Sequence, residues 1–339
     1  MVGAVLTLFL HGVGHFHPSN EITNTFLEEL DIGTSDSWIL ERVGIRSRRT
    51  VLPLDYIRET RNQDVRAGDQ LKEFSTFEMS ARAAEMALER AGLALTDVGM
   101  ILCGSSASDY ASPADACMVA KELDIDIPAF DVNSACTSFL AQIHLLGMMQ
   151  PDKLPEFVLV CGSDSLTKTV DYSDRSAAVL WGDGAAAAIL STKAPCSRTI
   201  TGTALESRPT AGDKVIVPRV GHFAQEGRTV QSFAIRKTAA GFEKLREEFE
   251  SADRTLHFVG HQANLRMLEA VCRRCEIPDE RHHFNVEWYG NTGAASSASI
   301  ISMNWDKWQP HDDIAVIGVG AGLTWSRYLI RFGSPGEQE

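Results

Sequence analysis

The sequence predicts an α/β fold assembled from two similar halves. Short apolar runs of strand length alternate with amphipathic stretches of helix length, which is the order expected for βαβ units. The second half of the chain repeats the order of the first. With 339 residues, of which 44% are hydrophobic and 23% charged, the chain is large enough to bury a substantial core, and its composition is not that of a disordered protein.

The first half reads as an alternating series of strands and helices. Residues 1–10 are apolar and run into a Gly/His/Pro turn, so they are expected to form a first buried strand. Residues 80–91 have the spacing of an amphipathic helix that ends at Gly92. The other expected elements are a strand at 100–104, a helix at 113–123, a strand at 130–133, a helix at 136–149, and strands at 157–162 and 185–190.

The second half repeats this order, and each half contains a turn that opens a helix rich in Ala and Ser. That turn holds Cys136 in the first half and Asn291 in the second. Small residues allow two such helices to cross closely. The pattern indicates an internal duplication, with halves at 1–190 and 191–339. The elements expected in the second half are a strand at 256–260, a helix at 262–275, a helix at 294–304, and strands at 314–318 and 328–332.

One segment, residues 50–76, does not fit the duplication. It is charged and weakly periodic, and it is too long for an ordinary connector. We therefore expect an insertion that either lies on the surface or caps a site.

Charge and cysteine content exclude several classes of protein. The net charge of −13 argues against a nucleic-acid partner, because duplex-binding proteins present a basic face. No apolar run approaches the roughly 18 residues of a membrane span, and the apolar start lacks the basic region of a secretory signal, so a cytoplasmic location is expected. Seven cysteines, an odd number scattered along the chain, do not form a disulfide framework.

Three residues carry the expected chemistry. Cys136 sits where a strand ends and a helix begins, and a helix start stabilises a thiolate, the species that attacks a thioester. His261 follows the strand 256–260, and Asn291 lies in the second Ala/Ser turn; both side chains can donate to a developing oxyanion. Each also fits an ordinary structural role, His261 as a polar residue at a helix start and Asn291 as a turn former.

Three motifs around these residues resemble the active-site motifs of β-ketoacyl-acyl-carrier-protein synthase III, a condensing enzyme of the thiolase superfamily. They are NSACTSF at 133–139, HQANLR at 261–266 and GNTGAAS at 290–296, in the family's order and with similar spacing. Further matches lie at 38–46, 181–186 and 318–325, so the resemblance covers nearly the whole chain. It implies a thiolase-like fold with five layers in the order αβαβα, and a homodimer.

The resemblance also implies a role for each matching residue. Cys136 would accept an acyl group from acyl-CoA or from acyl carrier protein, with an oxyanion hole made by the backbone N–H groups of Cys136 and Gly320. His261 and Asn291 would stabilise the enolate formed when a malonyl (or β-ketoacyl) thioester on the carrier protein loses its activating group. No permanently bound cofactor is expected. The residues expected to contact CoA or the carrier arm are Trp38, Arg42, Lys168 and Arg266.

The chain departs from the family pattern near the expected acyl tunnel. Ser112 stands before Pro113, where the family commonly has a bulky aromatic that the dimer partner contributes to close the acyl tunnel, and Val319 stands where Phe is common. With the insertion 50–76, these differences favour a wider tunnel and a medium or long primer, in fatty-acid or specialised polyketide synthesis. A basic rim for an acidic carrier protein is a further hypothesis, and it would be made by Arg46, Arg48 and Arg49.

Other interpretations remain open at the level of sequence. Pyrone-forming, resorcinol-forming and head-to-head condensing relatives share the fold, and acyl transfer without condensation or a catalytically silent subunit are further alternatives. Residues 318–322 look like a nucleotide-binding loop, but no helix follows them. Cys272 and Cys275, near His282 and His283, suggest zinc only weakly because no second Cys pair exists. No metal is expected.

Overall fold

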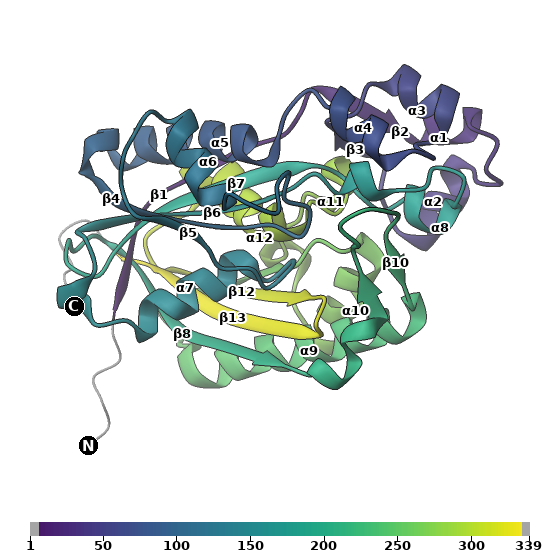
Figure 1. Cartoon of the computed structure of the whole chain (residues 1–339). Helices are drawn as coiled ribbons and strands as arrows, with labels where there is room; N and C mark the ends of the chain where they lie inside the picture. Colours follow the sequence, from purple (N-terminus) through teal and green to yellow (C-terminus); the bar gives the residue numbers. More distant parts are fainter. Residues whose placement is uncertain (1–6, 334–339) are drawn as a thin grey trace.

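The computed structural model describes residues 7–333, and its central feature is one mixed sheet of nine strands (Figure 1). The strand order is β11-β12-β13-β8-β1-β7-β6-β4-β5, in which β4 runs parallel to β5 and β6, and β11 runs parallel to β12. The bounds are β1 Leu8–Phe16, β4 Val98–Gly104, β5 Ala129–Asp131, β6 Phe157–Asp164, β7 Gly184–Ser191, β8 Arg198–Ser207, β11 Thr255–Gly260, β12 Asp312–Gly320 and β13 Thr324–Phe332.

Six helices and the two halves of this sheet make five layers. The helices α5 and α6 pack on the strands of the first half, and α9 packs on β12 and β13 of the second half, with α10 against α9 (Figure 1). Between them, α7 contacts β4, β6, β8 and β13, and α12 contacts β1, β7, β11 and β12. The expected αβαβα arrangement is therefore confirmed. The bounds are α5 Thr76–Ala91, α6 Asp115–Glu122, α7 Ser138–Met148, α9 Gly227–Phe249, α10 Leu265–Cys275 and α12 Ser296–Met303.

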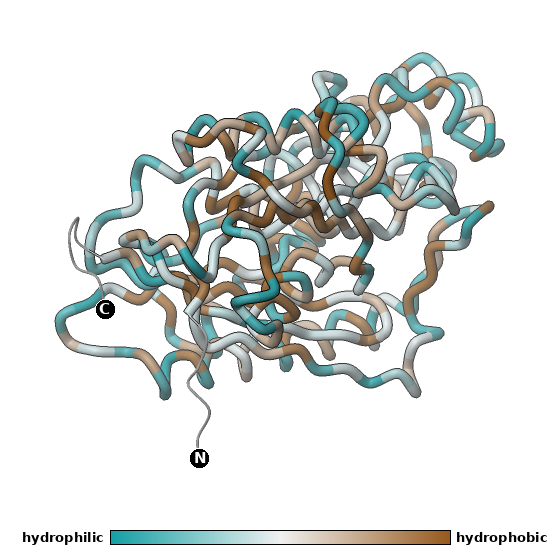
Figure 2. Tube along the Cα trace, turned by 60° about the vertical axis from the view of Figure 1, so that its left-hand side comes forward, coloured by the Kyte–Doolittle hydropathy of each residue, from teal (hydrophilic) through white to brown (hydrophobic). Residues whose placement is uncertain are grey.

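The local sequence explains why these elements form where they do. Every residue of β6 and β7 is buried, as expected for apolar runs covered on both faces. Helix α5 starts earlier than the expected residue 80, because Ser75 and Glu78 form a capping box, and it ends as predicted at Gly92 in a left-handed conformation. In Figure 2 the hydrophobic stretches run through the middle of the molecule, and the outer loops are largely hydrophilic.

The first strand differs from its prediction. Residues 1–6 of the expected strand 1–10 lie outside the described residues, and β1 continues to Phe16 through the Gly/His segment that was expected to turn. The segment stays extended because residues 12–16 pair with β7 after a register shift that follows Leu10. Gly14 is required there, since a Cβ at this position would lie 2.0 Å from the carbonyl oxygen of Ala83 in α5. The strand and the helix therefore touch through their backbones.

The insertion 50–76 is ordered and helical rather than a loose loop. It forms α3 and α4 and buries Ile57 in a hydrophobic cluster with Tyr172. Asn62, fully buried between the two helices, donates hydrogen bonds of 2.9 Å to the carbonyl oxygens of Lys168 and Val170. The elements of this region are β2 Asn20–Thr23, α1 Asn24–Glu29, α2 Asp36–Arg42, β3 Ser47–Thr50, α3 Leu54–Thr60 and α4 Val65–Leu71.

The predicted boundary between the two halves lies at the end of β7, and the nine-stranded sheet is continuous across it. Strand β7 ends at Ser191, β8 begins at Arg198, and both pair with β1. The strands of both halves belong to one hydrogen-bonded sheet. The division into 1–190 and 191–339 therefore remains a prediction of an internal duplication. Within residues 7–333, no helix has the length and apolar character needed to cross a membrane. The remaining short elements are α8 Arg175–Ala178, β9 Val215–Ile216, β10 Ala224–Gln225 and α11 Val286–Tyr289.

Candidate active site

Cys136 lies in a tight turn between β5 and α7. The turn is closed by local hydrogen bonds, among them Ala135 N–H to Asn133 Oδ1 at 2.9 Å and Ser138 N–H to the Ala135 carbonyl at 2.9 Å. Ala135 itself has a φ of 50°, in the left-handed region that residues other than glycine rarely adopt. A strained residue held by its surroundings is common beside reacting groups. The strain here directs the following cysteine to the wall of a cavity.

The predicted stabilisation of a Cys136 thiolate is wrong for the resting protein. Burial, followed by the charge of Asp164, raises the pKa of Cys136 to about 12, although N–H groups of Cys136 and Ala321 and the Ser106 hydroxyl favour the thiolate. The first residue of α7 is Ser138, so Cys136 precedes the helix by two positions, and the helix end does not outweigh desolvation. The resting nucleophile is therefore a thiol, and its proton must leave during acylation.

His261 is held as a neutral imidazole. Its backbone N–H binds the Ile317 carbonyl at 2.8 Å, and its Nδ1 lies 2.8 Å from the Ser296 hydroxyl of α12. The side chain is buried, and burial lowers its pKa to about 4. Because Nδ1 is occupied by Ser296, Nε2 is the ring nitrogen left for a ligand. At neutral pH this uncharged ring can donate or accept a hydrogen bond.

Asn291 presents its amide N–H₂ group because its oxygen is already used. The side-chain Oδ1 accepts the Gly293 N–H at 3.0 Å, and the backbone pairs with Leu180 and Gly182 beside β7. Gly293 has a φ of 56°, and a Cβ there would lie 2.0 Å from a carboxylate oxygen of Asp164. The turn therefore requires glycine, and it fixes the orientation of the Asn291 amide.

The backbone of the segment 320–321 lies beside Cys136, where the Gly320 N–H is predicted to complete an oxyanion hole. Gly320 does approach the nucleophile closely, since a Cβ there would meet the backbone nitrogen of Cys136 at 3.2 Å. The N–H group that interacts with the Cys136 sulfur, however, belongs to Ala321. The N–H groups of Cys136 and Ala321 both favour negative charge beside the Cys136 sulfur, as the two backbone donors of an oxyanion hole do.

Asp164, which the sequence did not single out, connects the surroundings of Cys136 to those of Asn291. It is fully buried at the end of β6. One carboxylate oxygen accepts the Ser106 N–H at 2.6 Å, the Ser105 hydroxyl at 3.0 Å and the Ala107 N–H at 3.1 Å. The other accepts the Ala294 N–H at 2.8 Å. An aspartate at the end of an apolar strand is buried and needs hydrogen-bond donors around it. That pattern in the sequence could have identified Asp164.

Cys136, His261 and Asn291 line one cavity of about 330 Å³, so the structure brings the three sequence-predicted residues together. Trp38 and Arg42 line the same cavity, and the Arg42 guanidinium lies 5.8 Å from the centre of the Trp38 ring. The remaining wall is mostly apolar and comes from both halves; it includes Val179, Leu180, Trp181, Val215, Phe233, Ala234, Met267, Val319 and Leu323.

Arg266 is close to the mouth, but its guanidinium is engaged. It donates to the Leu40 carbonyl at 2.6 and 3.0 Å and pairs with Glu269 at 2.9 Å, so it joins α10 to α2. Arg175 was missed by the sequence analysis. Its guanidinium lies 4.8 Å from the centre of the Trp38 ring, on the helix α8. Trp38 is therefore contacted by two cations, a surface suited to an aromatic, phosphorylated ligand.

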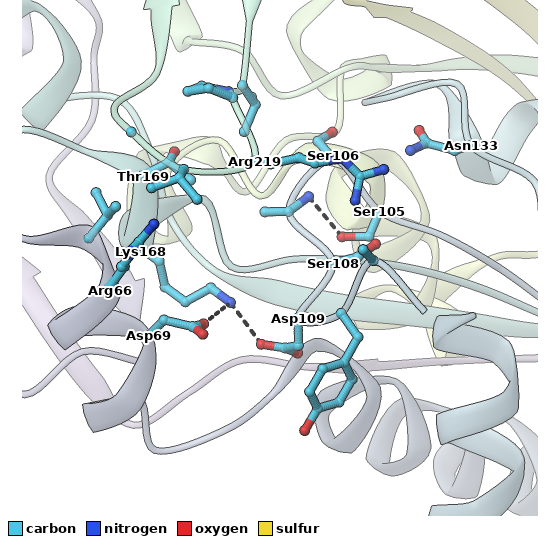
Figure 3. Close-up of a pocket in the computed structure, with 18 of the residues that line it drawn as sticks. Arg66, Asp69, Ser105, Ser106, Ser108, Asp109, Asn133, Lys168, Thr169 and Arg219 are labelled. Carbon is cyan, nitrogen blue, oxygen red and sulfur yellow. Dashed lines mark hydrogen bonds and ion pairs between the residues drawn. The ribbon is translucent and has the colours of Figure 1, made fainter. Parts of the chain in front are cut away.

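Lys168 is not at this mouth. It is buried in a second cavity, where its ammonium pairs with Asp69 at 2.9 Å and Asp109 at 2.8 Å (Figure 3). Of the two expected tunnel residues, Val319 lines the Cys136 cavity, whereas Ser112 is exposed on the loop that follows β4 and lines neither cavity. The sequence could not show which cavity Lys168, Val319 or Ser112 would line, because each cavity is lined by segments far apart in the chain.

The expected basic rim is also incomplete. Arg48 is fully buried and donates to the Val179 carbonyl and to Asn24, so it serves the interior. Arg46 remains exposed and pairs with Glu287 at 2.7 Å. Arg49 lies over the Tyr289 ring.

The cysteines of the weak zinc motif take part in the core. Cys272 and Cys275 are buried on α10 in the hydrophobic cluster of the second half. His282 stacks on Phe258, and His283 lies 3.0 Å from His257. Within residues 7–333, no group of three or more metal-binding side chains is arranged around a common point.

The five-layer fold, with a cysteine, a neutral histidine and an asparagine amide on one cavity, is that of a thiolase-type condensing enzyme. A model of 3-oxoacyl-[acyl-carrier-protein] synthase III matches residues 130–209, and a model of the C-terminal part of that enzyme matches residues 248–332. The chain is 32% identical to the β-ketoacyl-[acyl-carrier-protein] synthase III of Coxiella burnetii, over 95% of this chain and 98% of that one. It belongs to the β-ketoacyl-[acyl-carrier-protein] synthase III family.

Solved structures agree with this assignment. The 3-oxoacyl-[acyl-carrier-protein] synthase III of Aquifex aeolicus superposes with a TM-score of 0.84 at 28% identity, covering 96% of this chain and 100% of that one. The priming β-ketosynthase of the R1128 polyketide pathway superposes with a TM-score of 0.77 at 25% identity, with 97% of each chain covered. The chain is thus a condensing acyltransferase whose family acts on acyl-carrier-protein thioesters.

Proposed function

We propose that this enzyme transfers an acyl group to Cys136 and then condenses it with a malonyl thioester on acyl carrier protein, giving a β-ketoacyl product. The observation that carries the proposal is the convergence of Cys136, a neutral His261 and the free amide of Asn291 on one cavity. A neutral donor pair suits an enolate, because it stabilises negative charge without protonating the carbon that must attack.

In the first step the Cys136 sulfur attacks the carbonyl carbon of an acyl thioester. The thiol proton leaves the sulfur as the new carbon–sulfur bond forms and finally protonates the departing thiol. The carbonyl oxygen becomes an oxyanion that the N–H groups of Cys136 and Ala321 stabilise. The carbon–sulfur bond of the donor breaks, and acyl-Cys136 remains.

In the second step the malonyl thioester loses CO2, and the electron pair of the broken carbon–carbon bond forms an enolate. His261 Nε2–H and the Asn291 amide donate hydrogen bonds to the enolate oxygen. The enolate carbon then attacks the carbonyl of acyl-Cys136, and the Cys136 sulfur leaves as a thiolate that regains a proton. Every group in this scheme comes from the chain and its substrates, so no permanently bound cofactor is required.

The CoA or carrier-protein arm of the substrate enters the Cys136 cavity past Trp38. Its ring, contacted by Arg42 and Arg175, would hold the adenine or phosphate end of acyl-CoA, and Arg266 would fix α10 beside the mouth. The buried, doubly paired Lys168 has no part in this entry. The expected cytoplasmic location remains a prediction.

Self-association through β5 would give the homodimer that the family implies. Strand β5 is at one edge of the nine-stranded sheet, and Phe130 on it is 38% exposed. Tyr110, on the neighbouring loop after β4, is 50% exposed. An edge strand with exposed aromatic residues is suited to pair with a second copy of the chain.

The proposal is tested by separating acylation from decarboxylation. The protein is incubated with acyl-CoA and examined by intact mass, and CO2 release from malonyl-carrier protein is followed in parallel. Cys136→Ala and Cys136→Ser should take up no acyl group, whereas His261→Ala and Asn291→Ala should be acylated but lose CO2 release by at least a hundredfold.

The same measurements address the other candidates. An enzyme that only transfers acyl groups would be acylated and release no CO2, and a silent subunit would not be acylated at all. Equal loss of acylation in all four variants would contradict the proposed division of roles between Cys136 and the His261–Asn291 pair.

A further inference from the structure

The loop that follows β4 brings one side-chain hydroxyl to the nucleophile. Strand β4 ends at Gly104, and Ser106 is the second residue after it (Figure 3). The Ser106 hydroxyl hydrogen-bonds to the Cys136 thiol and favours its thiolate form. Two backbone N–H groups, those of Cys136 and Ala321, act in the same direction. Ser106 is therefore the favourable contact at the sulfur that a side-chain substitution can remove.

Asp164 fixes the backbone of this loop. One of its carboxylate oxygens accepts the Ser106 N–H at 2.6 Å and the Ala107 N–H at 3.1 Å. The same oxygen accepts the hydroxyl of Ser105 at 3.0 Å. These three hydrogen bonds do not involve the Ser106 side chain. The position of the loop therefore does not depend on the Ser106 hydroxyl, which is held facing the sulfur by the bonds of its neighbours.

The proton of the Ser106 hydroxyl is otherwise weakly engaged. Apart from Cys136, its partner within residues 7–333 is the second oxygen of Asp164, at 3.4 Å. That distance exceeds the roughly 2.5–3.0 Å of an ordinary bond between a hydroxyl and an oxygen. Because a hydroxyl rotates about its carbon–oxygen bond, the proton can turn to the Cys136 sulfur when negative charge develops there. A hydrogen bond to a charged acceptor is stronger than one to a neutral thiol.

The Cys136 sulfur carries negative charge at two points of the proposed reaction. It does so when it attacks the acyl donor, and again when it leaves the acyl group to the enolate carbon. Burial and the charge of Asp164 oppose this charge and raise the pKa of Cys136 to about 12. A thiol with a high pKa is a slow leaving group. A donor that binds the thiolate more strongly than the thiol or the thioester lowers the barrier of both steps.

We propose that Ser106 is a further catalytic residue, whose hydroxyl donates a hydrogen bond to the Cys136 sulfur as it attacks and as it leaves. This inference rests on the proposed function, because both steps belong to it. The hydroxyl keeps its own proton throughout. In acylation an electron pair of the sulfur forms the new carbon–sulfur bond, and in condensation that pair returns to the sulfur. Loss of CO2 from the malonyl group places no charge on the sulfur, so Ser106 has no part in it.

The test removes the hydroxyl and follows the sulfur directly. Iodoacetamide is added at pH 8, 9 and 10, and alkylation of Cys136 is measured from the mass of its peptide. In Ser106→Ala the rate should fall about fivefold or more at each pH, because less thiolate forms. Acylation by acetyl-CoA or hexanoyl-CoA should fall by a similar factor. CO2 release from malonyl-carrier protein, by enzyme acylated beforehand, should change by less than about twofold.

Two further variants control for structural effects. Ser106→Thr keeps a hydroxyl at the same carbon and should react within about threefold of the wild type. Ser108→Ala removes a hydroxyl from the same loop, where the side chain is exposed and bonds to Asp115. It should leave the alkylation and acylation rates of Cys136 unchanged.

The outcomes separate this inference from the function on which it rests. Equal alkylation of the wild type and Ser106→Ala would overturn the inference and leave the proposed function standing. So would a loss of CO2 release as large as the loss of acylation, which would show that Ser106 acts through Asp164 on the turn at Asn291. A Thr variant as slow as the Ala variant would also contradict it. If no thioester acylates the wild type, the proposed function fails, whereas the alkylation rates still decide whether Ser106 stabilises the thiolate.

Discussion

Replacing Asp164 by Asn should stabilise the protein and weaken its catalysis. Asp164 is fully buried, and burial raises its pKa from 3.8 to about 6 in spite of the four N–H and O–H groups that favour its charge. The difference corresponds to about 3 kcal/mol by which folding disfavours the carboxylate at neutral pH. Asn has the same shape and stays uncharged, so Asp164→Asn should gain up to about 3 kcal/mol in free energy of unfolding at pH 7, less the roughly 1.4 kcal/mol of the Ala294 hydrogen bond that an amide N–H₂ cannot accept.

The sign of the pH dependence follows from the same shift. The folded protein holds the Asp164 proton more tightly than the unfolded chain does, so the destabilisation is complete above pH 6 and is lost as the pH falls toward 3.8. The advantage of the variant should therefore shrink between pH 7 and pH 4. Urea unfolding of both proteins at pH 7.5, 6 and 4.5, at one protein concentration, measures it. Asp152→Asn, with a side chain 72% exposed, is the control and should change stability by less than about 0.5 kcal/mol.

The same variant should have a lower rate of catalysis, although it is more stable. In Asp164→Asn the amide N–H₂ takes the place of one carboxylate oxygen and faces the Ala294 N–H, so the turn that orients Asn291 loses its acceptor. Loss of this one hydrogen bond, about 1.4 kcal/mol, should lower the rate of CO2 release roughly tenfold. A variant that is less stable than the wild type at pH 7, or whose stability difference is the same at every pH, would refute the reasoning.

Two further predictions concern His261 and the turn at Gly293. Because burial lowers the pKa of His261 to about 4, its neutral form persists above that value, and the rate of CO2 release should show no inflection near pH 6.5; a fall centred at 6.5 in a pH–rate profile would contradict this assignment. Gly293→Ala should destabilise the protein by more than about 3 kcal/mol, because the new Cβ would meet Asp164 at 2.0 Å with φ at 56°. Gly92→Ala has a similar φ of 66° but open space around it, so it should cost only about 1 kcal/mol; equal losses of melting temperature in the two variants would show that the contact with Asp164 is unimportant.

The sequence predicted those parts of the molecule that depend on local pattern. Alternating apolar and amphipathic runs identified most strands and helices, and the two small-residue turns led to Cys136 and Asn291 before any tertiary contact was known. Helix α9 was missed, although its Phe233, Phe242 and Leu245 are buried on one side of a long amphipathic stretch. That periodicity was present in the sequence and was detectable.

Properties that depend on burial could not be predicted in the same way. The protonation of Cys136 is decided by the cavity around it and by Asp164, which lies 28 positions further along the chain. Lys168 and Arg175 are close in sequence, but Lys168 lines the second cavity whereas Arg175 lies over the Trp38 ring. Arg48 belongs to a basic run, and only the packed structure shows that it is interior while Arg46 is exposed.

The pairing of β7 and β8 with the same strand has a consequence for how the chain can be divided. A cut in the connection 192–197 would leave both cut ends hydrogen-bonded to β1, with α7 and α12 still held between strands of both fragments. The pieces would have to lose the middle layer of the molecule in order to separate. The connection is therefore a site for circular permutation or for encoding the enzyme as two polypeptides, one bearing the nucleophile and the other the His–Asn pair, that assemble into one working enzyme.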